Sequence, residues 1–232
     1  MRLLLIAFAT WLTFLSGVGL AQDARPLKNL SELASFAQTY YQKPQPELIG
    51  NVIESLPAIG LRQRPDAVPP FFAFFSEVFA ANPSLVPQWK PLIAKQDEFT
   101  KQFLERALAL SEAGGVLTLQ GHSAALNDSY WGAFFASGRA VFIGKLVEQL
   151  RYWDERDDLQ LFTAGASAKW SLASNAQLHP RVRSILEHPT FGAADPRTRT
   201  QIAELLAHGP AKVLQDTAEV IKKQRQAGKW TP

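Results

Sequence analysis

Apolar residues recur at helical spacing along almost the whole chain after residue 29, and prolines and glycines interrupt the pattern at short intervals. The first such stripe consists of Leu30, Leu33, Phe36, Ala37 and Tyr40, and it ends before Pro44. Apolar residues at this spacing predict an amphipathic helix that packs against a core. Because about ten such stripes are joined by short turns, we expect an all-α fold of helices stacked as antiparallel pairs, as a solenoid-like array or an irregular helical bundle.

Two segments are expected at the centre of this fold. Residues 71–79 are mostly phenylalanine and apolar around most of the helical circumference, which predicts burial on most sides. Residues 159–177 combine an apolar stripe with small side chains such as Gly165, which let neighbouring helices approach closely. We also expect Asn127 or Asp128 to cap the helix that contains Tyr130.

The best candidate for a domain boundary in the mature chain is residues 190–196, which contain Gly192 and Pro196. We therefore expect a main helical domain over residues 22–189 and a C-terminal helical hairpin over residues 190–232 that packs on it. Gly209 and Pro210 would separate the two helices of this hairpin, residues 197–208 and 211–227.

The first 21 residues have the order of a secretory signal peptide. Arg2 precedes an apolar run over residues 3–18, and Gly19 and Ala21 place small residues where a signal peptidase cleaves. A helix needs roughly 20 apolar residues to cross a bilayer, so this run is too short for a membrane anchor. We expect cleavage after Ala21 and a periplasmic or secreted mature chain with no stable membrane anchor.

The sequence contains no cysteine, which excludes disulfides, thiolate metal sites, cysteine nucleophiles and lipid attachment to a cysteine. The net charge of +3 is small and the charges are interspersed, so no nucleic-acid-binding face is expected. The basic residues 222–225 are interpreted as cations at the negative end of a helix dipole. Phosphate-loop motifs are absent from the sequence, and we expect no cofactor.

Histidines offer a weak candidate site at most. Three of them, His179, His188 and His208, stand just before prolines or a Gly-Pro pair and mark helix ends, and no two histidines have the i, i+4 spacing of a helical zinc site. His122, beside Gly121, is the one histidine in a setting that could be catalytic. A capping or packing role is the favoured interpretation of His122, and no metal site is expected.

Glu77 is the stronger catalytic candidate, because phenylalanines flank it. Burial there would raise the pKa of its carboxyl group, as a general acid requires. The favoured alternative is that Ser76 and Glu77 form the polar edge of an otherwise buried helix. The acidic residues 154–158 are a second place for an acid and a base, although carboxylates there also suit the N-terminus of the next helix.

Tryptophans could line a groove for a sugar or a peptide. Those of the mature chain that lie in apolar stripes are expected in the core, namely Trp89, Trp131, Trp153 and Trp170. Trp230 is expected to be the exposed one.

Residues 130–135 (Tyr-Trp-Gly-Ala-Phe-Phe) and 170–176 (Trp-Ser-Leu-Ala-Ser-Asn-Ala) resemble segments of uncharacterised secreted all-helical proteins of Gram-negative bacteria. The succession of helices also resembles helical-repeat proteins of the TPR or HEAT kind in style. These resemblances imply the all-α fold and bring no activity with them.

Three functions remain open from the sequence. The leading hypothesis is a non-enzymatic periplasmic or secreted protein that binds a protein or an envelope component, through a concave helical surface. The second is a secreted hydrolase of envelope polymers, with Glu77 or residues 154–158 as acid and base. The third is a carrier of an apolar ligand, with a cavity near residues 71–79.

Overall fold

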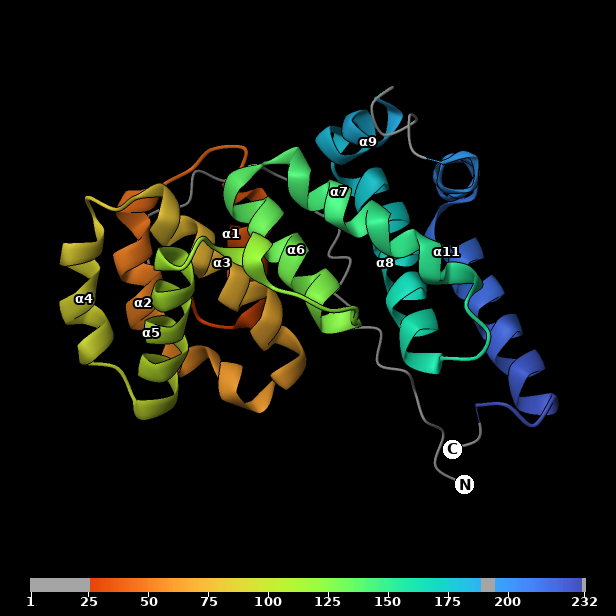
Figure 1. Cartoon of the computed structure of the whole chain (residues 1–232). Helices are drawn as coiled ribbons and strands as arrows, with labels where there is room; N and C mark the ends of the chain where they lie inside the picture. The colour runs from red at the N-terminus through yellow and green to blue at the C-terminus, as the bar shows by residue number, and fades with distance from the viewer. Residues whose placement is uncertain (1–25, 189–194, 231–232) are drawn as a thin grey trace. The chain divides into compact units, whose positions relative to one another are not determined.

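The structure is a computed structural model, and it describes residues 26–188 and 195–230 (Figure 1). It confirms the all-α prediction: it is 80% helical, with ten α-helices and no strand among the described residues. The α-helices are α1 (Leu30–Tyr40), α2 (Ile49–Ile59), α3 (Val68–Ala81), α4 (Val86–Ala94), α5 (Glu98–Glu112), α6 (Ala124–Ser137), α7 (Ala140–Gln149), α8 (Leu159–Leu178), α9 (Pro180–Glu187) and α11 (Pro196–Gln226). Short 3-10 helices include η4 (Val116–Thr118) and η5 (Leu150–Asp154). The predicted signal segment and its cleavage point after Ala21 lie outside the described residues.

The described chain groups into two compact units. The N-terminal unit contains the residues up to Leu119 together with Asp128–Arg139, and the C-terminal unit contains Gln120–Asn127 and the residues from Ala140 onward. This grouping divides the chain inside α6 and not near residue 190, because α8 contacts both α9 and α11 within the C-terminal unit. The predicted limits of the main domain and the C-terminal hairpin stay a prediction, and most of residues 190–196 lie outside the described residues.

Helix α3 forms the centre of the N-terminal unit, as its phenylalanines predicted. Phe74 makes edge-on ring contacts with Phe36 and Tyr40 of α1 and with Phe75, so the rings pack as one aromatic core. The fully buried large side chains of α3 are Phe71, Phe74, Phe75 and Phe79. Burying apolar area of this kind is the main source of the stability of a domain.

Helix α6 begins earlier than the sequence predicted. The Ser123 hydroxyl accepts a hydrogen bond from the backbone N–H of Leu126 (3.1 Å), which is the geometry of an N-terminal cap. The expectation that Asn127 or Asp128 caps this helix is therefore wrong, and both lie within it. Further along α6, Gly132 lies against the backbone of α3, where a Cβ would stand 1.9 Å from the Pro70 carbonyl oxygen.

Helix α8 is the centre of the C-terminal unit, and it contacts α7, α9, α11 and η5. Its small residues are used as predicted. A Cβ at Gly165 would lie 2.4 Å from the Trp153 backbone nitrogen, so η5 can approach α8 only because this position is glycine. Helix α11 is broken at Gly209 (φ 73°, ψ −179°), which confirms the predicted division at Gly209 and Pro210.

Among the described residues, none of the helices combines the length and the apolar character that a membrane span requires.

Candidate functional site

Glu77 lies on the buried side of α3 within the N-terminal unit. Its side chain is only 6% exposed. One carboxylate oxygen, Oε1, accepts a hydrogen bond from the backbone N–H of Val116 (3.2 Å). The other, Oε2, accepts from Nη1 of Arg139 (3.4 Å), whose own side chain is 54% exposed. The carboxylate therefore joins α3 to η4 and to Arg139, two residues after the end of α6.

The turn before η4 is shaped to bring Val116 to this carboxylate. Gly114 and Gly115 have positive φ angles (104° and 77°), a backbone conformation that favours glycine. A Cβ at Gly115 would lie 2.9 Å from Glu77 Oε1, so a larger residue would displace the carboxylate or the turn. Val116 itself is fully buried at the start of η4.

Burial raises the pKa of Glu77, and its bonds to Val116 and Arg139 oppose that rise. The expectation that Ser76 and Glu77 form the polar edge of α3 is wrong, because both side chains are buried. The side of α3 that carries Glu77 is covered by η4, where the Val116 N–H donates to the carboxylate. The carboxyl group thus has the environment of a general acid but uses both oxygens to hold its own unit together.

His122, the weaker catalytic candidate, belongs to the C-terminal unit. Its Nδ1 donates a hydrogen bond to the side-chain oxygen of buried Gln149 (3.2 Å), and its ring lies 4.6 Å from that of Tyr152. These contacts give His122, which is exposed, a packing role. Glu77 and His122 fall in different units, so neither unit pairs them as acid and base.

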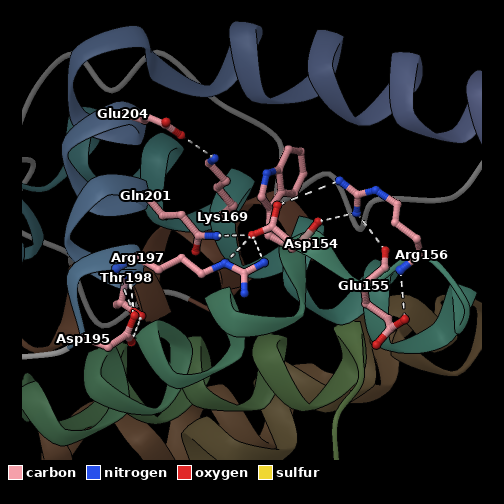
Figure 2. A network of polar contacts seen from close by, with 10 residues as sticks. Asp154, Glu155, Arg156, Lys169, Asp195, Arg197, Thr198, Gln201 and Glu204 are labelled. Atoms are coloured by element: carbon pink, nitrogen blue, oxygen red, sulfur yellow. Dashed lines mark hydrogen bonds and ion pairs between the residues drawn. The ribbon is translucent and has the colours of Figure 1, made fainter.

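The acidic residues 154–158 do not act together as one cluster. Asp154 accepts bonds from Nε of Arg197 (2.7 Å) and from the amide of Gln201 (3.1 Å), both on α11 (Figure 2). Asp158 caps α8 by accepting from the N–H groups of residues 160 and 161. Its capping role confirms that carboxylates here suit the helix N-terminus.

A buried lysine lies beside this network. Lys169 of α8 is 6% exposed at its side chain, and its Nζ lies 2.9 Å from Oε2 of Glu204 on α11. The same ammonium group stands 4.5 Å from the centre of the Trp153 ring, within the range of a cation–π contact. Figure 2 shows Lys169 between these elements and close to the Asp154 network. Lys169 carries no functional signal in the sequence, because one lysine among small residues forms no motif.

Asp128, which was expected to cap α6, has a second property that the sequence did not predict. It is half-buried on α6, and burial, with the nearby charge of Asp66 as a second cause, raises its pKa to about 8. Asp66 itself is bound by Arg64 through two hydrogen bonds (2.8 and 3.1 Å), which hold the pKa of its carboxyl group below the usual value. A carboxylate five residues past the true cap position gives no sequence signal of burial.

Trp230 is not the exposed tryptophan that its position suggested. Its ring lies 4.9 Å from that of Phe162, which is fully buried on α8. The neighbouring Lys229 Nζ lies 2.6 Å from Oδ1 of Asp157. The segment after α11 therefore folds back onto the start of α8.

Among the described residues, no group of three or more histidine or carboxylate side chains is placed to hold a metal ion. The predictions of no metal and no cofactor stay predictions.

No family model, curated protein or solved structure matches this chain, and the resemblances noted from its sequence stay predictions.

Proposed function

We propose that the mature chain is a periplasmic or secreted, non-enzymatic helical protein that binds a protein or an envelope component. The observation that carries the proposal is the engagement of Glu77, the strongest catalytic candidate. Its two oxygens bind Val116 N–H and the Arg139 guanidinium, so a substrate would have to displace bonds that hold α3, η4 and the end of α6 together.

The exposed apolar side chains support a binding role for the C-terminal unit. The most exposed large apolar residues of the described chain are Val141 on α7, Leu178 on α8 and Leu214 on α11, and all three belong to this unit. Lys212 and the exposed cations near the end of α11 flank Leu214 in the sequence. Apolar and cationic side chains on the same helices suit a partner with apolar groups and negative charge.

The experiment is a binding assay with purified residues 22–232 against three envelope fractions: murein sacculi, outer-membrane vesicles and soluble periplasmic protein. We expect saturable binding to one fraction, and at least a tenfold loss of affinity in Leu178→Asp or Leu214→Asp. Ala109→Asp places the same charge at an exposed position of α5 in the N-terminal unit, and this variant is the matched control. Binding to none of the fractions, or an equal loss in the control, would overturn the proposal.

A secreted hydrolase with Glu77 as general acid is the second candidate, favoured by the raised pKa of that carboxyl group. Glu77→Gln tests it, because an amide still accepts from Val116 N–H but cannot donate an acidic proton. Turnover of murein by the wild-type chain that disappears in Glu77→Gln, with an unchanged melting temperature, would establish the hydrolase and contradict the binding proposal.

The carrier hypothesis is the least supported of the three. The rings around which a cavity would form, those of residues 71–79, pack against one another and against α1 and α5.

A further inference from the structure

The segment that follows α11 returns to the body of the C-terminal unit. Gly228 (φ 76°) ends α11, and the N–H of Lys229 bonds to the Gln224 carbonyl oxygen (2.9 Å) in the pattern of a Schellman turn. This turn reverses the chain, and residues 227–230, here called the return segment, then reach the first turn of α8. Trp230 packs on Phe162, and Lys229 pairs with Asp157.

The return segment occupies a formed site, here called the α8 aromatic site, which consists of Trp153, Arg156, Asp157 and Phe162. The Trp153 and Phe162 rings lie 5.6 Å apart, and the Arg156 guanidinium stands 5.4 Å from the Phe162 ring centre. Asp157 is 84% exposed at the rim. An aromatic floor with a guanidinium and a carboxylate beside it recognises an aromatic side chain next to a cation.

Three features make the contact of the return segment with this site less favourable. Trp230 has a positive φ of 52°, which is unfavourable for a bulky residue. Its indole N–H is buried and finds no hydrogen-bond acceptor among the described residues. The ion pair of Lys229 with Asp157 is exposed and therefore weak.

These costs are of the same order as the gain from burying one ring, so little free energy separates the bound and released segment. A partner segment that reaches the site without the strained φ, and that satisfies its own indole N–H, would compete successfully. A partner segment that fits better can therefore replace the return segment in this site.

We propose that the α8 aromatic site binds a partner peptide in which a tryptophan follows a basic residue, and that the chain's own Lys229 and Trp230 cover it until that partner arrives. This inference rests on the proposed binding function and names the chemistry of its partner. The return segment then acts as a competitor within the same chain, which lowers the apparent affinity for the partner by the fraction of time the site is covered.

The test measures binding of a fluorescent peptide with the sequence of residues 226–232 (Gln-Ala-Gly-Lys-Trp-Thr-Pro) to residues 22–232 of the protein. We expect Trp230→Ala in the protein to tighten binding about two- to fivefold, because a segment held with little net free energy covers the site for only part of the time. Lys229→Glu in the protein should act in the same direction, because it repels Asp157 and releases the segment with its ring intact. This second variant keeps the test decisive if Trp230→Ala lowers the stability of the fold.

A charge exchange tests the site itself. In the Trp230→Ala background, Asp157→Lys should weaken binding of the parent peptide, and a peptide with glutamate in place of its lysine should recover the lost affinity. Asp216→Lys reverses a partly exposed carboxylate on α11 and is the matched control, which should leave peptide binding unchanged.

Equal affinity of the peptide for wild type, Trp230→Ala and Lys229→Glu would overturn the inference, as would equal binding of a peptide whose tryptophan is alanine. The two proposals fail separately in this design. If the chain binds an envelope fraction but not the peptide, the α8 aromatic site is wrong and the binding function stands; if it binds neither, both fail.

Discussion

The two units hold charged groups in different surroundings. In the N-terminal unit, the Glu77 carboxylate is enclosed and bonded to a backbone N–H and a guanidinium. In the C-terminal unit, Asp154 is 34% exposed and shares bonds with Arg197 and Gln201 near the surface. The first arrangement is protected from water and salt, and the second is not. Glu77 therefore depends on burial, whereas the network of Asp154 can be weakened by ionic strength.

Close helix approach is a feature that the two units share, and its loss gives the largest expected effects. Gly132 and Gly165 each admit a backbone segment against a helix, and Cβ atoms there would lie 1.9 and 2.4 Å from backbone atoms. We expect Gly132→Ala and Gly165→Ala each to lower the free energy of unfolding by about 3 kcal/mol or more, because backbone cannot move aside cheaply. Chemical denaturation followed by circular dichroism measures this loss.

Gly50→Ala is the matched control on α2. Its Cβ would meet only the end of the flexible Leu92 side chain, at 3.2 Å. Alanine is favoured over glycine in a helix by about 1 kcal/mol, so this variant should be neutral or slightly stabilised. A loss at Gly50 equal to the loss at Gly165 would show that close helix approach is not what these glycines provide.

The units are also expected to respond to pH in opposite directions. Asp128 in the N-terminal unit has its pKa raised from 3.8 to about 8, so the folded chain keeps a proton that the unfolded chain has lost, and stability falls as pH rises through this range. His179 in the C-terminal unit has its pKa lowered from 6.5 to about 4 by burial. The unfolded chain then binds a proton that the folded chain does not, and stability falls as pH drops from 6.5 towards 4.

Melting temperatures of wild type, Asp128→Asn and His179→Gln across this pH range separate the two effects. Asp128→Asn should remove the loss on the alkaline side, and His179→Gln the loss on the acidic side. A wild-type chain whose melting temperature rises steadily from about pH 6 to about pH 8 would contradict the assignment to Asp128.

The smallest expected effect is that of the Asp154 network. Asp154→Asn should cost about 1 kcal/mol at low salt, since its partners are charged but near solvent. The cost should shrink at about 1 M salt, where the screening length is about 3 Å. Thermal melts of both chains at the two salt concentrations measure the difference, and a cost that salt leaves unchanged would place Asp154 in the same class as Glu77.

Local patterns predicted the helices well, because each helix pattern lies within a few turns of sequence. The phenylalanines of α3, the small residues of α8 and the break at Gly209 all act where they stand in the sequence. Contacts across long sequence distances were missed. Glu77 was expected on a polar edge because nothing near it shows that Val116 and Arg139 come to meet it. The return of Trp230 to Phe162 depends on a turn at Gly228 that periodicity does not record.

Hydrogen exchange of the Val116 amide tests whether Glu77 serves the structure of its unit. In the wild-type chain this amide should exchange slowly, because it is buried and bonded to the carboxylate. Glu77→Gln should preserve most of the protection, and Glu77→Ala should remove it while amides of the core helices stay protected. If the Val116 amide exchanges equally fast in wild type and in Glu77→Ala, the carboxylate does not hold η4, and the claim is contradicted.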